Sequence, residues 1–265
     1  MKRISVNDTQ LNVLDAGHGP PLLLVHGFPL DHSMWARQIE DLSGDFRVIA
    51  PDLRGFGSSD VTHRTVSMEQ FADDLAALLD AVGVTDKATL CGLSMGGYVA
   101  WQFWRRHRSR LNGLILCDTR AEADAPEAAR ARLVSADRAI IEGVGFLADS
   151  MIEKLFAPST LRDRPDIVEG TRSIMLATSP AGAAAAFRGM AARRDSSEIL
   201  SEIDVPTLVI CGEHDVISPV DEMRGIAQRI AGAAFVEIAD AGHMSPLEKP
   251  REVSAAIGDF LARIA

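Results

Sequence analysis

The fold is decided by residues 88–107, ATLCGLSMGGYVAWQFWRRH. A short apolar run typical of a strand leads into GLSMG, and the residues from Gly97 to His107 have the pattern of a helix. The turn between them is too tight for side chains two positions before and after Ser94, and the residues at those positions, Gly92 and Gly96, have none. The context predicts a strand, a sharp turn and a helix, with the Ser94 hydroxyl raised into a cleft at the carboxyl end of a sheet.

Length and composition limit the classes of protein to be considered. The chain has 265 residues, of which 47% are hydrophobic and 24% charged, as in a globular protein with one core and an insertion. No apolar run approaches the roughly 20 residues that cross a bilayer, and the first residues lack the pattern of a secretory signal, so we expect no membrane association and a cytoplasmic location. A net charge of −10 argues against a nucleic-acid partner, whereas self-association is left open.

The other apolar runs predict the rest of the sheet. Most are short, apolar on both faces and separated by helical patterns, which indicates strand–helix–strand units and a sheet covered on both sides. Strands are predicted at 4–6, 11–14, 22–25, 48–50, 89–91, 114–117, 208–211 and 235–238, and helices at 68–82, 98–107, 220–230 and 253–264. The fold class is α/β, with a mainly parallel, doubly wound sheet of eight strands that opens on an antiparallel hairpin.

One connection is far longer than the others. Residues 119–204 separate two predicted neighbouring strands, and a loop of that length needs structure of its own. Apolar residues at helical spacing, punctuated by prolines, predict about four helices. We therefore expect a core formed by residues 1–118 and 205–265 and a helical cap formed by residues 119–204, laid over the carboxyl edge of the sheet.

A serine hydroxyl at neutral pH needs a base to remove its proton and an acid to orient that base. His243 lies in DAGHMSP, residues 240–246, after the last predicted strand and before the last helix. Loops at the carboxyl ends of parallel strands converge, so this loop is expected to reach the site of Ser94. The order serine, acid, histidine along the chain also selects His243 as the base among seven histidines.

The predicted acid is Asp215. It ends GEHD, residues 212–215, directly after the predicted strand at 208–211, and so projects from the same edge of the sheet. Glu213 and Asp118 are alternatives, because each also follows a strand. Asp240 is only three residues from the base and is expected to shape the loop that carries it.

The oxyanion formed in acyl transfer needs two donors that are in place before the reaction starts. The main-chain N–H of Met95, next to the serine, is one of them. The second is predicted in HGFP, residues 26–29, where the chain turns sharply after an early strand, and the N–H of Phe28 is the expected donor.

Together these motifs resemble those of the α/β-hydrolase family. The likeness rests on HGFP at 26–29, DLRGFGSS at 52–59, GLSMGG at 92–97, GEHD at 212–215 and GH at 242–243. It implies Ser94 as nucleophile, His243 as base, Asp215 as its orienting acid, and Phe28 and Met95 as oxyanion donors. It also implies that residues 52–55 form a structural turn.

Within that family the chain is similar to small carboxylesterases, to 3-oxoadipate enol-lactonase-like hydrolases and to cofactor-free haloperoxidases that act as perhydrolases. Haloalkane dehalogenases and epoxide hydrolases of this fold have an aspartate at the turn, so the serine at position 94 disfavours both activities. The expected function is hydrolysis of carboxylic esters of short to medium acyl chain, with no cofactor or metal. Lactone hydrolysis and perhydrolysis are alternatives, and a small-molecule receptor on the same fold is the alternative from another class.

The substrate pocket is expected to be mainly apolar. Its predicted residues are Trp35 from the core and Met151, Phe156, Met175, Phe187 and Met190 from the cap, although packing between cap and core explains each cap residue equally well. A lactone that carries a carboxylate would need a cation, which Arg188, Arg193 or Arg194 could supply.

Overall fold

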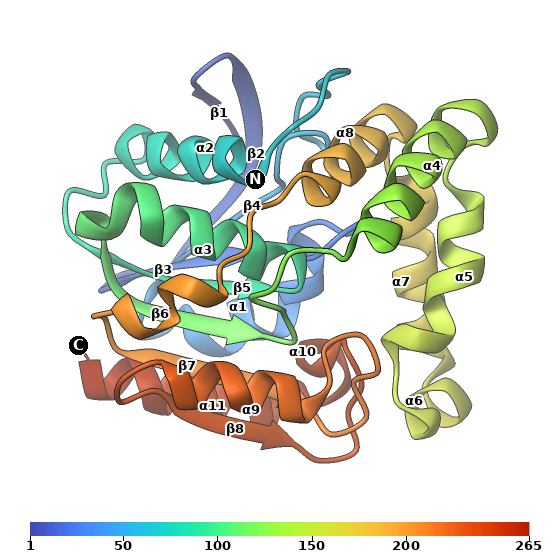
Figure 1. The fold of residues 1–265 in the computed structure, drawn as a ribbon. Helices are drawn as coiled ribbons and strands as arrows, with labels where there is room; N and C mark the ends of the chain where they lie inside the picture. The colour runs from blue at the N-terminus through green and yellow to red at the C-terminus, as the bar shows by residue number, and fades with distance from the viewer. Residues whose placement is uncertain (265) are drawn as a thin grey trace.

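The computed structural model describes residues 1–264, which form one central sheet with helices on both faces and a cluster of helices at one end (Figure 1). The strand order is β1-β2-β4-β3-β5-β6-β7-β8. The strands are β1 (Lys2–Val6), β2 (Thr9–Ala16), β3 (Pro21–Val25), β4 (Arg47–Pro51), β5 (Ala88–Leu93), β6 (Leu111–Cys117), β7 (Thr207–Gly212) and β8 (Ala234–Ile238). The predicted α/β fold with an eight-stranded sheet is confirmed.

The sheet is parallel from β4 to β8, and β1 and β2 form the predicted antiparallel hairpin at its edge. The central strands β5 and β7 are buried along their whole length, which explains why their sequences are apolar on both faces. Parallel strands release their carboxyl ends at one edge, so the loops after β3, β5, β6, β7 and β8 all open on the same side of the molecule.

Right-handed crossovers place the helices on two faces. Helices α2, α3 and α9 pack on one face, and α1 and α11 pack together on the other. Their bounds are α1 (Ala36–Leu42), α2 (Met68–Ala81), α3 (Met95–His107), α9 (Val220–Arg229) and α11 (Pro250–Ile264), with short α10 (Ser245–Glu248) before the last. The sequence pattern missed α1, because seven residues hold too little periodicity to be recognised.

The connection between β6 and β7 contains five helices in the described chain, one more than the four predicted. They are α4 (Pro126–Glu142), α5 (Gly145–Leu155), α6 (Pro158–Asp163), α7 (Pro165–Ala177) and α8 (Pro180–Ala191). Four of them begin with proline, which is tolerated at the first helical position. Helix α5 begins at Gly145 without that signal and was therefore not separated. The helices gather beyond the carboxyl ends of the strands (Figure 1).

The 3₁₀ segments η1 (His32–Trp35), η2 (Arg108–Arg110) and η3 (Ser197–Glu202) complete the described elements. Among residues 1–264, no helix combines the length and the apolar character required to span a membrane.

Candidate active site

Ser94 stands at the turn between β5 and α3 in a strained backbone conformation. Its φ of 53° and ψ of −113° are unusual for a residue with a side chain. A Cβ on Gly92 would collide with the carbonyl of Gly96, and one on Gly96 would collide with the carbonyl of Val25 in β3. The Ser94 N–H donates to the Cys117 carbonyl at 3.0 Å, which ties the turn to the end of β6. Two glycines and one cross-strand bond therefore hold a half-buried serine at the edge of the sheet.

The carbonyl of Ser94 is fixed as well. It accepts hydrogen bonds from the main-chain N–H groups of Gly97 and Tyr98, at 2.9 and 3.3 Å, and from the hydroxyl of Thr119, at 2.7 Å. Thr119 follows β6 and packs directly on Gly97, where a Cβ would strike it. No sequence pattern indicates this contact, because it joins residues that follow two different strands.

The predicted base and acid are hydrogen-bonded to each other. His243 Nδ1 lies 2.8 Å from Asp215 Oδ2, and the residues are only 3% and 4% exposed. Asp215 also accepts from the N–H groups of Ile217 and Ser218, at 2.7 and 3.0 Å. Burial alone would raise the pKa of Asp215, but the charge and hydrogen bond of His243 and the bonds from Ser218 hold that pKa below its usual range. The acid is therefore a carboxylate able to accept a hydrogen bond from the Nδ1–H group of His243.

Ser218 is a polar neighbour that sequence reasoning missed. Its hydroxyl donates to Asp215 Oδ2 at 2.5 Å and lies 3.3 Å from His243 Nδ1. The only sequence signal is a serine three residues after an aspartate, a common turn pattern. With the Nδ1 proton directed at Asp215, the lone pair of His243 is on Nε2.

The alternative acids have other hydrogen-bonding partners than His243. Asp118 accepts from the N–H of Gly212 at 2.8 Å and from the hydroxyl of Ser245, and burial together with the charge of Asp215 raises its pKa. Glu213 accepts from the N–H of Asp240 at the surface. Within residues 1–264, Asp215 is the acid that is hydrogen-bonded to His243.

The loop after β3 passes beside the serine. A Cβ on Gly27 would lie 3.3 Å from the Ser94 Cβ and 2.8 Å from a methyl carbon of Leu93, so glycine favours this close approach. Among residues 1–264, the N–H groups of Phe28 and Met95 make no hydrogen bond to a protein acceptor. Two buried residues thus keep main-chain donors unpaired on either side of Ser94.

His26 holds this loop in place. Its Nε2 accepts from the N–H of Leu53 at 2.9 Å, and its Nδ1 lies 2.9 Å from the Gly27 carbonyl, to which it donates. Burial lowers the pKa of His26, so the ring is neutral and fills both roles. His26 is a structural link between the loop after β3 and the turn after β4.

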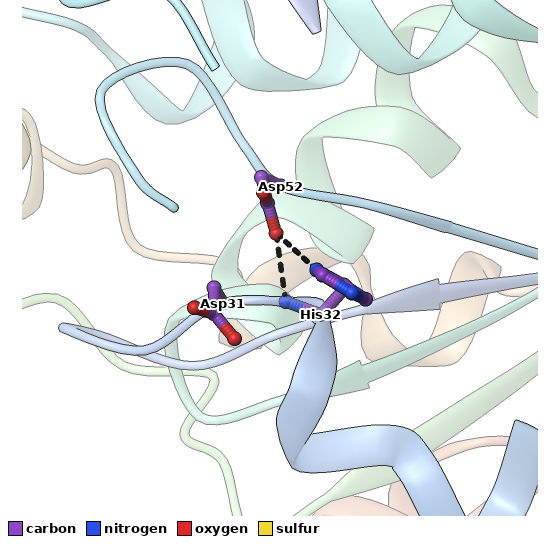
Figure 2. A group of neighbouring side chains, drawn as sticks. All are labelled: Asp31, His32 and Asp52. Atoms are coloured by element: carbon purple, nitrogen blue, oxygen red, sulfur yellow. Dashed lines mark hydrogen bonds and ion pairs between the residues drawn. The ribbon is translucent and has the colours of Figure 1, made fainter. Parts of the chain in front are cut away.

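A second cluster brings Asp31 and His32, which follow β3, together with Asp52, which follows β4 (Figure 2). Asp52 Oδ1 accepts from the main-chain N–H of His32 at 3.0 Å and from its ring Nδ1 at 2.6 Å. Its Oδ2 accepts from Asn12 Nδ2 and the Ser58 N–H, at 2.8 and 2.9 Å. Both carboxylate oxygens are thus occupied by protein donors. The implied role of residues 52–55 as a structural turn agrees with these contacts.

Two of the six predicted pocket residues contact the loops of the site. The ring of Phe187 lies 4.5 Å from that of Phe28, centroid to centroid, and the backbone of Phe156 packs against Gly242 beside the predicted base. The other four are Trp35, Met175 and Met190, which are buried, and Met151, which is partly buried in α5. Their place in a substrate pocket stays a prediction.

The three arginines considered for a substrate carboxylate are placed differently from one another. Arg193 is buried and pairs with Asp124 at 2.8 Å. Arg188 lies on α8 and reaches an aspartate of the cap only at 3.5 Å. Arg194 lines a groove with Trp104, at the end of α3 opposite the serine turn. The structure does not bring these arginines together as one cation site.

Comparisons with known proteins bear on the family and the fold of the chain. The family model described as the alpha/beta hydrolase fold matches residues 20–250. The chain is 48% identical to a thermophilic esterase from Thermogutta terrifontis, with a TM-score of 0.97 over 99% of this chain and 98% of that one. It is 33% identical to an enol-lactonase from Burkholderia xenovorans LB400, with a TM-score of 0.92 over 98% of this chain and 100% of that one. It is also 31% identical to the AB hydrolase superfamily protein YisY from Bacillus subtilis, over 94% of each chain.

Proposed function

The chain belongs to the α/β-hydrolase family, and on that premise we propose that it hydrolyses carboxylic esters of short to medium acyl chain through an acyl-enzyme. One observation carries the proposal: the Asp215–His243 pair, joined at 2.8 Å, lies at the sheet edge where the turn presents Ser94. A serine, an imidazole and a buried carboxylate form the machinery of acyl transfer. The similarity to the Thermogutta esterase supports the choice of esters.

In the proposed reaction, Ser94 Oγ attacks the acyl carbon while His243 Nε2 takes its proton. The same nitrogen then gives that proton to the leaving alcohol, and the acyl group stays on the serine. A water molecule attacks the acyl-enzyme with His243 again as the base, and the acid is released. Asp215 holds the proton on Nδ1 and stabilises the imidazolium that forms in each step.

The unpaired N–H groups of Phe28 and Met95 are the proposed oxyanion donors. Main-chain donors on two different elements, the loop after β3 and the start of α3, cannot reorganise during the reaction. A donor fixed in this way stabilises the tetrahedral intermediate without a reorganisation cost, and losing one typically lowers kcat by about 10²–10³.

The test is turnover of p-nitrophenyl acetate and butyrate by the purified protein. We expect continuous release of p-nitrophenol by the wild type and loss of turnover in Ser94→Ala. Ser173→Ala, in the exposed surface of α7, is the matched control and should retain full activity. Turnover by Ser94→Ala would contradict the assignment. A wild type whose Tm shifts with ligand but which never turns over would favour the receptor function instead.

Lactone hydrolysis is the second candidate, supported by the similarity to the Burkholderia enol-lactonase. The same steps open a lactone, with the leaving alcohol still attached to the acyl group. Because Arg193 is paired with Asp124, we propose that neutral lactones are better substrates than lactones carrying a carboxylate. Rates for neutral and anionic lactones of equal ring size decide this point.

A further inference from the structure

Glu248 joins the loop of the proposed base to the cap. It is 6% exposed and ends α10, five residues after His243. Its Oε1 accepts from the N–H of Gly242 at 2.7 Å, and its Oε2 accepts from the N–H of Ala157 at 2.8 Å. Ala157 belongs to the cap, between α5 and α6. A single carboxylate thus bridges the residue before the base and a segment 91 positions away from Glu248 in the chain.

The two segments also touch backbone to backbone. The N–H of Met244 donates to the Leu155 carbonyl at 3.0 Å. A Cβ on Gly242 would lie 2.7 Å from both the Ala157 nitrogen and the Phe156 carbonyl carbon, so glycine is required for this contact. His243 therefore lies between Met244, which is hydrogen-bonded to the cap, and Gly242, which packs on the cap and is linked to it through Glu248.

The carboxylate is held without an opposite charge. Within the described residues Glu248 forms no ion pair. Burial raises the pKa of Glu248, whereas hydrogen bonds from Thr160 and the two N–H groups act in the opposite direction. Burying a carboxylate that only neutral donors support costs desolvation free energy. Both of its oxygens nevertheless accept hydrogen bonds, one from each of two segments. This arrangement indicates that Glu248 fixes the relative position of the two segments rather than adding stability.

We propose that Glu248 is a positioning residue that couples the position of the cap on the core to the orientation of the base. Its two hydrogen bonds hold the loop 242–244 and the segment 155–157 at one fixed separation, so that His243 and Phe156 of the cap move together. The proposal rests on the proposed function, because it takes His243 as the base. A misplacement of about 1 Å in such a base can lower the rate on the order of 10²-fold.

The decisive variant is Glu248→Gln. Glutamine has the same shape but offers one acceptor, so one of the two N–H groups must face an amide NH₂. With p-nitrophenyl butyrate we expect kcat to fall on the order of 10²-fold while KM stays within a few-fold. The Nδ1–H proton resonance of His243 in the NMR spectrum should shift or broaden, because the ring loses its fixed orientation.

Gln38→Leu is the matched control. Gln38 is buried, and its Nε2 donates to the carbonyls of Pro246 and Pro250 at 3.1 and 3.3 Å. It thus supports the segment that contains Glu248 through carbonyls that belong neither to residues 242–244 nor to the cap. We expect both Glu248→Gln and Gln38→Leu to have a lower Tm than the wild type. The control should keep the wild-type kcat and the wild-type His243 resonance.

Equal losses of kcat in Glu248→Gln and Gln38→Leu would overturn the proposal, as would an unchanged kcat and resonance in Glu248→Gln. If Glu248→Gln does not fold, Thr160→Val decides, because it keeps the shape and removes the hydroxyl beside Glu248. A several-fold fall in kcat with a shifted resonance supports coupling, and no change in either refutes it. If the wild type has no esterase activity, the proposed function fails, and the resonance of His243 in the variants still tests the coupling.

Discussion

Replacing Asp215 with asparagine tests the proposed acid because the structure dictates how the amide must lie. Asp215 Oδ1 accepts from two main-chain N–H groups, those of Ile217 and Ser218, at 2.7 and 3.0 Å. The amide oxygen must take that position, which places the NH₂ group where Oδ2 now lies, 2.8 Å from His243 Nδ1. Two donors cannot face each other, so Nδ1 must become the acceptor and the proton moves to Nε2.

The base is then blocked while the shape of the site is kept. A wrong tautomer of this kind lowers kcat by about 10⁴-fold, which corresponds to about 5.4 kcal/mol in the activation free energy. The measurement is kcat for p-nitrophenyl butyrate, with circular dichroism and Tm to show that the fold is intact. Asp215→Asn that keeps more than about a tenth of wild-type kcat would refute the reasoning.

Asp118→Asn is the matched control, since both residues are buried carboxyls at the ends of adjacent strands. The amide oxygen can accept from the Gly212 N–H as Oδ1 does now, and the Ser245 hydroxyl can turn to accept from the NH₂. Burial and the charge of Asp215 raise the pKa of Asp118, so its neutral form, which asparagine imitates, is favoured. We expect kcat within about tenfold of wild type. A larger loss in Asp118→Asn than in Asp215→Asn would transfer the role of acid to Asp118.

Two further variants test the framework around the site. Gly96→Ala forces a Cβ into the Val25 carbonyl and should lower the free energy of unfolding by roughly 1–3 kcal/mol. Gly170→Ala, in open space on α7, should raise the free energy of unfolding by up to about 1 kcal/mol. Equal Tm values for the two variants in calorimetry would contradict this expectation. The hydrogen bond to Asp52 raises the pKa of His32 above 6.5. The stabilisation of the folded state by protonated His32 is therefore fully present below pH 6.5 and is lost as the pH rises through the folded-state pKa. The Tm difference between wild type and His32→Gln should therefore shrink as the pH rises, and a difference that grows with pH would disprove the linkage.

Patterns that are local in the chain predicted the fold well. Apolar runs marked the strands from β3 to β8 because a strand inside a covered sheet is apolar over its own few residues, whereas alternation marked the hairpin of β1 and β2. Gly92 and Gly96 marked the turn at Ser94 because the collision they avoid involves residues close in the sequence or in the adjacent strand. Helix α5 was not separated because no proline marks its start.

Contacts between distant segments were beyond such patterns. Thr119 is an ordinary polar residue in the sequence, and only the alignment of β5 and β6 places it beside Ser94. The approach of Ser218 to His243 likewise requires the loops after β7 and β8 to meet. The same holds for Arg193, whose pairing with Asp124 depends on how the cap folds back on itself. Which cap residues reach the substrate stays a prediction.

The amino-acid sequence alone determined the order of the strands and of most helices along the chain, the sharp turn at Ser94 and the choice of His243 and Asp215, because periodicity and glycine placement act over a few residues. Only the tertiary structure decided the hydrogen-bonding partners of those side chains and the bridge from Glu248 to the cap. The physical reason is that a hydrogen bond depends on distance and direction in space. Segments far apart in the chain acquire both only when the sheet and the cap have packed together.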